Sequence, residues 1–96
     1  MFIISLTYKT SIENVESFIP QHNVFLTKYY ELGHFIASGR KEPRTGGVII
    51  GNAASKDEIE KIISEDPFYI HQIADYEITA FVPTKYNENF KLFIED

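Results

Sequence analysis

Two side chains of this sequence could together carry out acid/base chemistry, a histidine at position 22 and an aspartate at position 66. His22 lies at helical spacing from Phe25 and Tyr29, which places its imidazole on an apolar face of a helix. Asp66 precedes Pro67, a pairing typical of a helix start. A carboxylate that contacts an imidazole fixes its tautomer and leaves the second ring nitrogen available as a base. The two residues therefore predict a proton-transfer site, provided that the fold brings them together.

Each of these residues also has a purely structural interpretation. A histidine on an apolar face can be a core residue whose ring is satisfied by a backbone group or a water. Asp66 can be a helix cap alone, although a capping carboxylate keeps lone pairs for a second partner. We expect His22 to lie near a helix start, where the positive end of the helix dipole favours the neutral imidazole.

Candidate binding residues cluster further along the chain. Ser38 and Gly39 end a predicted strand, where a glycine permits close backbone approach to a ligand or simply marks a turn. Arg40, Lys41 and Arg44 form a basic cluster in an acidic chain. This cluster could attract an anionic substrate to the mouth of a site, or it could be solvated surface.

The composition argues against several other kinds of chemistry. The 96 residues include no cysteine and only three histidines, and His34 and His71 show no metal-ligand spacing with His22. We therefore expect no metal and no cofactor. With a net charge of −5 and scattered basic residues, nucleic-acid binding is not expected. The apolar run at residues 1–10 is too short to span a bilayer and lacks the features of a signal peptide, so we expect a cytoplasmic protein.

The first half of the chain predicts a strand followed by helix. Apolar alternation predicts a strand over residues 2–8, and Thr10 stands at the cap position of a capping box. Because proline is tolerated in the first turn of a helix and not in its interior, we expect a short lead-in helix and then a main helix from near Pro20 to Gly33.

The second half predicts three strands and one further main helix. Ser55 is the expected cap of this helix, with Glu58 at the box position, and the helix runs to about Glu65. Asp66 then opens one more helical turn. The predicted strands cover residues 34–39, 47–54 and 75–83, the first two as a hairpin. The tail, about 84–96, carries apolar residues and is expected to pack, on a neighbouring subunit for example.

This order of elements is that of the ferredoxin-like split βαβ unit, an α+β fold with two helices on one face of a four-stranded antiparallel sheet. A single domain over residues 1–96 is expected. Alternation assigns to one face Phe2, Ile4, Leu6, Phe35, Ala37, Ile78 and Ala80, and to the other Ser5, Thr7, His34, Ile36, Ser38, Glu77, Thr79 and Phe81. The second face mixes polar and apolar residues, which favours contact with another subunit across a partly wet cavity, as in a homodimer.

The segment QHNVFLTKYYELGHFIASGRKEPRTGGVIIGNAASKDEIEKIISEDPF resembles the YciI-like family, also called YCII-related proteins. Its landmarks are the helix histidine followed by an apolar stripe, the ASG triplet, the GG that opens the next strand, and the DPF triplet after an acidic helix. The resemblance covers most of the chain. It implies a ferredoxin-like subunit that pairs into a dimeric α+β barrel, with one pocket per subunit lined by a histidine and an aspartate.

By this resemblance the histidine and aspartate of the family correspond to His22 and Asp66, and its serine before glycine to Ser38. One branch of the family resembles dehydrochlorinases that act on hydroxylated aromatic rings. This sequence departs from the pattern at Arg40, where relatives carry proline, so the rim of the pocket differs in charge and shape.

The resemblance favours a small cofactor-independent enzyme of lyase or isomerase type, dehydrochlorinase-like, acting on an aromatic or enolisable metabolite. In such a site the Ser38 hydroxyl, or a backbone N–H beside Gly39, would stabilise an enolate or phenolate oxygen, and Phe68 would stack on a ring or exclude water. Two alternatives remain open. The protein could bind a small molecule without chemistry, or it could be an interaction module whose bare sheet face only dimerises and which has no pocket.

Overall fold

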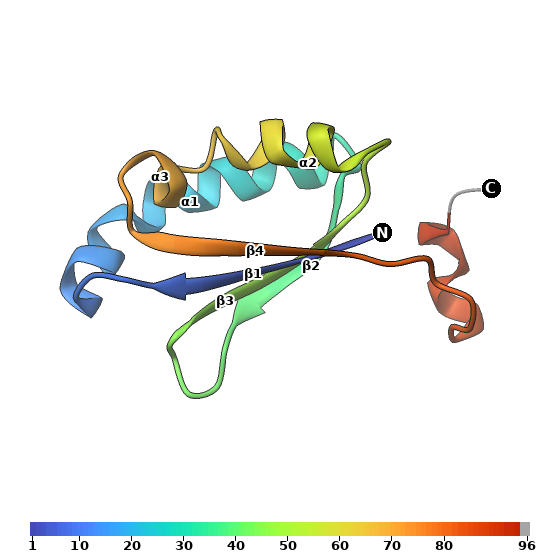
Figure 1. The fold of residues 1–96 in the computed structure, drawn as a ribbon, viewed down its shortest axis with the longest axis horizontal. Coiled ribbons are helices and arrows are strands. Elements are labelled where there is room, and N and C mark those ends of the chain that lie inside the picture. The colour runs from blue at the N-terminus through green and yellow to red at the C-terminus, as the bar shows by residue number, and fades with distance from the viewer. Residues whose placement is uncertain (95–96) are drawn as a thin grey trace.

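The computed structural model describes residues 1–94 and shows a four-stranded antiparallel sheet with helices on one face (Figure 1). The strands lie in the order β2, β3, β1, β4. Their bounds are Phe2–Tyr8 for β1, Phe35–Arg40 for β2, Gly46–Gly51 for β3 and Ala74–Ala80 for β4. The helices are α1 (Ile12–Glu31), α2 (Lys56–Ile63) and α3 (Pro67–Ile70), and a 3-10 helix, η1, covers Glu88–Phe93. The predicted α+β ferredoxin-like fold is confirmed.

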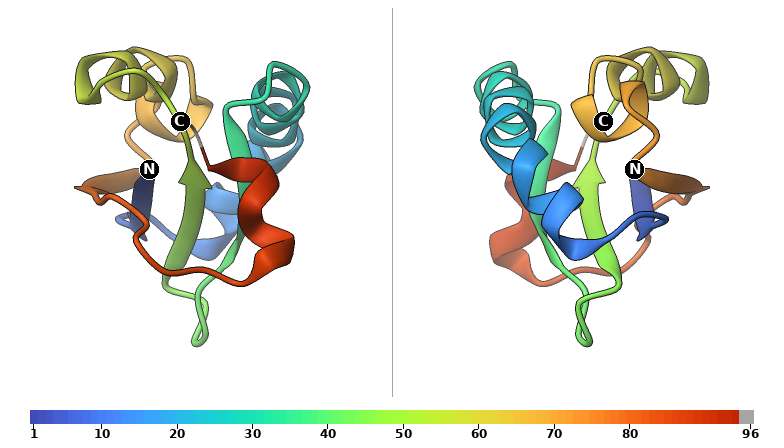
Figure 2. Two further views of the ribbon diagram at one scale, coloured as in Figure 1. Left: turned by 90° about the vertical axis from the view of Figure 1, so that its right-hand side faces the viewer. Right: turned by 90° about the vertical axis from the view of Figure 1, so that its left-hand side faces the viewer.

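The helices divide the covered face of the sheet between them. Figure 2 shows α1 over the half that contains β2 and β3, and α2 and α3 over the half that contains β1 and β4. Strands β3 and β4 each end three residues before the predicted end, at Gly51 and Ala80. Within residues 1–94 no helix is long and apolar enough to cross a membrane. Pairing of two copies into an α+β barrel stays a prediction.

Helix α1 is continuous through Pro20, so the predicted division into a lead-in helix and a main helix was wrong. The proline costs one intrahelical hydrogen bond. Burial of Val15, Phe25 and Tyr29 along one face of α1 offsets that cost, because helix stability in proteins comes mainly from packing of the apolar face. His22 therefore lies in the middle of α1. The predicted influence of the helix dipole on its imidazole was also wrong, because that influence is confined to the first turn.

The caps of α1 show how local polar groups set its ends. Ser11 is the N-cap, and its hydroxyl accepts a hydrogen bond from the backbone N–H of Asn14 at 3.2 Å. Thr10, the predicted cap, instead accepts from Asn14 Nδ2 at 3.0 Å. At the other end α1 stops at Glu31, two residues before the predicted end at Gly33. Gly33 follows the C-cap residue Leu32 with a φ of +84°, a left-handed conformation that glycine adopts readily.

The caps of the second half agree with the sequence-based prediction. Ser55 is the N-cap of α2 and accepts from the backbone N–H of Glu58 at 3.2 Å. Asp66 is the N-cap of α3, with Pro67 in its first turn. The carboxylate of Asp66 accepts from the backbone N–H of Phe68 at 3.0 Å.

A β-bulge in β2 decides which side chains of the hairpin face the helices. Pairing with β3 advances two residues on β2 between Phe35 and Ala37 but only one residue on β3, so Ile36 is the extra residue. Beyond the bulge, Ser38 pairs with Ile49, which is buried under the helices. Ser38 therefore lies on the helix-covered face. The predicted faces of Ser38 and Ala37 were wrong, because one inserted residue inverts the alternation of side chains.

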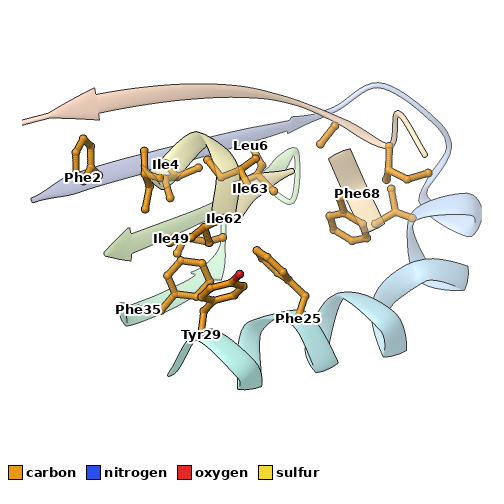
Figure 3. Packing of buried hydrophobic residues seen from close by; sticks show 14 residues of the cluster. Phe2, Ile4, Leu6, Phe25, Tyr29, Phe35, Ile49, Ile62, Ile63 and Phe68 are labelled. Atoms are coloured by element: carbon orange, nitrogen blue, oxygen red, sulfur yellow. The ribbon is translucent and has the colours of Figure 1, made fainter. Parts of the chain in front are cut away.

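The hydrophobic core fills the space between the sheet and the helices. Figure 3 shows Phe25 and Tyr29 of α1 pointing toward Phe35 and Ile49 of the sheet. The buried cluster consists of Phe2, Ile4, Leu6, Val15, Phe25, Tyr29, Phe35, Ile49, Ile59, Ile62, Ile63, Phe68, Ile73 and Ala74. Of the predicted inner positions, Ile78 is half-buried and Ala80 is exposed, because β4 lies at the edge of the sheet.

The tail packs at least partly on its own chain. Asn52 Nδ2 donates a hydrogen bond to the carbonyl oxygen of Phe93 at 2.8 Å. Contact of the tail with a neighbouring subunit stays a prediction, and its last two residues, 95–96, lie outside the described part of the chain.

Candidate acid/base site

His22 and Asp66 meet where α1 packs against the start of α3. Nδ1 of His22 lies 2.8 Å from Oδ1 of Asp66. Because a carboxylate can only accept, Nδ1 is the nitrogen that donates and carries a proton. The two residues that the sequence singled out are therefore in contact, although 44 positions separate them in the chain.

Asp66 caps a helix and orients the imidazole at the same time. Its side chain is fully buried, with no exposed surface. Oδ1 accepts from His22 and from the backbone N–H of Phe68, and Oδ2 accepts from the hydroxyl of Tyr76 at 2.5 Å. Three donors compensate for the loss of water around the charge, as a buried carboxylate requires. Asp66 is therefore both the cap of α3 and the hydrogen-bond partner of the His22 imidazole.

Tyr76 is a member of the site that sequence reasoning missed. Burial raises the pKa of its phenol well above the usual range, and the negative charge of Asp66 acts in the same direction. The phenol therefore remains protonated and remains a donor. A signal was present in the sequence: Tyr76 shares the alternation of Ile78 and Ala80, which were assigned to the inner face. A phenol on an inner face needs a polar partner.

The ring of His22 is held flat against an aromatic side chain. The imidazole stacks on Phe68 with ring centroids 4.1 Å apart and planes 2° apart, and only 14% of the His22 side chain is exposed. Within residues 1–94, Nε2 has no hydrogen-bond partner, and the structure shows no buried, unsatisfied side-chain nitrogen or oxygen there. Nε2 therefore reaches accessible space, with its lone pair available.

A cavity of about 390 Å³ adjoins His22, between α1 and the helix-covered face of the sheet. The predicted binding residues Ser38, Gly39, Arg40 and Phe68 all line it. The lining also includes Leu6, Tyr8, Ile19, Asn23, Leu26, Arg44, Gly47, Val48 and Ile49. A single chain builds this cavity, whereas the sequence predicted a wet cavity on the other face, and its presence counts against the interaction module without a pocket.

Two of the three residues of the basic cluster, Arg40 and Arg44, line the cavity, and Lys41 does not. Arg44 Nη1 lies 3.1 Å from a carboxylate oxygen of Glu16, and Lys41 donates to Thr7 at 3.3 Å. Only part of the predicted cluster therefore contributes to the site.

The hydroxyl of Ser38 forms a hydrogen bond with the hydroxyl of Tyr30 at the cavity wall. Its Oγ lies 2.6 Å from the hydroxyl of Tyr30, and either group can donate. When Tyr30 donates, the proton of Ser38 is free to bind an oxygen atom of a ligand.

The other two histidines lie outside this site. Nδ1 of His34 is 2.8 Å from the carbonyl oxygen of Asn52, and His71 stacks on Phe18 with centroids 4.6 Å apart. In the described part of the chain no three His, Asp or Glu side chains gather as a metal site would require.

Substitution of Tyr76 tests its role in holding the carboxylate. Tyr76→Phe leaves Oδ2 of Asp66 buried without a donor, so we expect the free energy of unfolding to fall by about 1–2 kcal/mol in urea denaturation. Tyr69→Phe is the matched control, because Tyr69 is 46% exposed and its hydroxyl has no partner within residues 1–94. Equal stability of the two variants would contradict the assignment.

Comparison with known proteins places this chain in a family. Residues 1–82 match the model of the family described as YCII-related domain. Curated proteins yielded no match. Nine chains of known structure are similar. One is 5-chloro-2-hydroxyhydroquinone dehydrochlorinase (TftG) from Burkholderia phenoliruptrix AC1100 in complex with 2,5-dihydroxybenzoquinone, with a TM-score of 0.73 and 17% identity over 92% of this chain and 96% of that chain. At this identity the likeness shows the fold alone. Because the family model covers residues 1–82 of this chain, the chain belongs to the YCII-related family.

Proposed function

We propose that this protein is an acid/base enzyme of lyase or isomerase type, in which Nε2 of His22 removes a proton from a small aromatic or enolisable substrate. One observation carries the proposal. A fully buried carboxylate binds Nδ1 of His22 at 2.8 Å, while Nε2 has no partner within residues 1–94 and adjoins a cavity. One nitrogen is thus used for orientation, and the other is available for chemistry.

Asp66 and its partners would prepare His22 for proton transfer. The carboxylate holds the proton on Nδ1, so that Nε2 presents its lone pair to the substrate. When Nε2 accepts a proton, the imidazolium forms next to a negative charge that favours it. Tyr76 and the backbone N–H of Phe68 hold the carboxylate in place through both states.

The proton transfer can lead to two kinds of product. In an elimination, Nε2 takes a proton from the substrate, the freed electron pair forms a new double bond, and a leaving group such as chloride departs with its bonding electrons. In an isomerisation, the imidazolium returns the proton at another atom. The dehydrochlorinase activity in the name of the structural neighbour supports the first kind for this chain.

The cavity walls suit a single ring with oxygen substituents. A volume of about 390 Å³ is in the range of small-molecule sites. We assign the Ser38 hydroxyl and a backbone N–H beside Gly39 to an enolate or phenolate oxygen, and Arg40 to the rim. Phe68 supports the imidazole and excludes water from it. We further propose that the protein acts as a cytoplasmic homodimer whose subunits pair through the sheet face without helices.

The proposal can be tested with two measurements. The first compares the His22 ring ¹⁵N resonances by NMR in the native protein and in Asp66→Asn. The native spectrum should show the proton on Nδ1, and this tautomer preference should weaken in the variant, because Nδ1 loses its charged acceptor. The second follows chloride release from chlorinated hydroxyhydroquinones and deuterium uptake from D₂O by enolisable carbonyl compounds. Ligands that bind and return unchanged, without deuterium, would identify a binding protein instead.

A further inference from the structure

We propose that the substrate carries a carboxylate on its ring and that Arg40 binds this group. The inference rests on the proposed function and names the substrate class for the same site. It starts from a cation in the cavity wall that the acid/base chemistry of His22 does not use.

The β-bulge places Arg40 at the rim of the site, where its exposed side chain lines the cavity. Ser38 and Arg40 are two residues apart beyond the bulge, so their side chains lie on the same, helix-covered face. Arg40 pairs across the hairpin with Gly47, which in turn pairs with Leu6. Because Gly47 has no side chain, the floor of the cavity stays open beside Arg40.

The charge of Arg40 is uncompensated within residues 1–94. Five ion pairs link side chains there, and Arg40 takes part in none of them. Arg44, the other cavity-lining cation, is paired with Glu16. The chain as a whole has a net charge of −5 and repels anions, so an anionic substrate requires a local cation. Arg40 is in the position to supply it.

The geometry of the cavity favours a carboxylate on a ring. A guanidinium binds a carboxylate through two parallel hydrogen bonds, which fixes orientation as well as charge. One unpaired guanidinium matches one carboxylate, whereas a phosphate dianion needs more positive charge. Arg40 comes from the sheet and His22 from α1 on the opposite wall. A ring held at its carboxylate by Arg40 would present another edge to Nε2.

Binding of two matched probes tests this assignment. The probes are 2,5-dihydroxybenzoate and 2,5-dihydroxybenzamide, which have similar shape and differ in charge, and their Kd values are measured by calorimetry. We expect the native protein to bind the carboxylate about 10-fold more tightly than the amide. Arg40→Gln should abolish the preference and Arg40→Lys should reduce it. Lys41→Gln is the control and should retain it, because Lys41 contacts Thr7 and does not line the cavity.

Several outcomes would overturn the inference. These are equal Kd values for the two probes in the native protein, failure of both to bind, and a preference that survives in Arg40→Gln. Repeating the comparison in His22→Gln separates this inference from the proposed function. That variant keeps Arg40, so the preference should persist there even if the native protein catalyses nothing.

Discussion

Replacement of His22 by glutamine is expected to lower kcat/KM by about 10²- to 10⁴-fold, the contribution typical of a general base. Glutamine is similar in reach and can still donate a hydrogen bond to Asp66, so the fold should survive. It cannot accept a proton near neutral pH. The loss should therefore appear mainly in kcat, because Arg40, Ser38 and the apolar walls still bind the substrate.

The measurement for His22→Gln is the initial rate of chloride release or deuterium uptake, with near-UV circular dichroism as the check on folding. His71→Gln is a matched control, because His71 is exposed, stacks on Phe18 and does not line the cavity. A folded His22→Gln variant with native turnover would remove the acid/base mechanism.

Replacement of Asp66 by alanine is expected to cost about 3–5 kcal/mol of unfolding free energy, because it removes a helix cap and the acceptor of three hydrogen bonds. The change removes the cap of α3 and leaves three buried or partly buried donors without an acceptor: Nδ1 of His22, the N–H of Phe68 and the hydroxyl of Tyr76. A domain of this size has a total stability of about 5–15 kcal/mol, so much of the population should unfold on modest heating.

Urea denaturation measures the effect of Asp66→Ala, and two other variants bracket it. Asp66→Asn keeps one acceptor oxygen for the backbone of α3 and should fall between the alanine variant and the native protein. Asp75→Ala removes an aspartate that is 74% exposed and paired with Lys9 at the surface, so its cost should stay within about 1 kcal/mol. If Asp66→Ala lowered the free energy of unfolding no more than Asp75→Ala does, the hydrogen bonds of the Asp66 carboxylate would not stabilise the fold.

The features that sequence predicted well are those set by neighbouring residues. Alternation over residues 2–8 gave the bounds of β1, because a strand buried on one face must repeat every two residues. Ser55 and Asp66 were identified as caps, because a cap needs only a side chain and an N–H two or three positions away. His22 and Asp66 could be proposed as candidates from such local signals together with the family resemblance.

The features that sequence missed depend on distant parts of the chain. Pro20 did not end a helix, because core contacts on both sides of it outweigh one lost hydrogen bond. The face of Ser38 was assigned wrongly because the extra residue at Ile36 appears only in the pairing of two strands. The partnership of Asp66 with Tyr76 likewise required knowledge of how α3 and β4 pack.

The single extra residue in β2 has a consequence for how relatives of this chain can diverge. Deleting Ile36, the extra residue between Phe35 and Ala37, would restore a regular ladder in which Ser38 still pairs with Ile49, so Ser38 and Arg40 would stay on the face of His22. Retaining Ile36 in a regular ladder would instead shift the pairing by one residue and turn Ser38 and Arg40 to the opposite face. A relative that has residue 36 but no bulge would thus keep the core and the proton-transfer pair and lose both polar groups of the cavity wall.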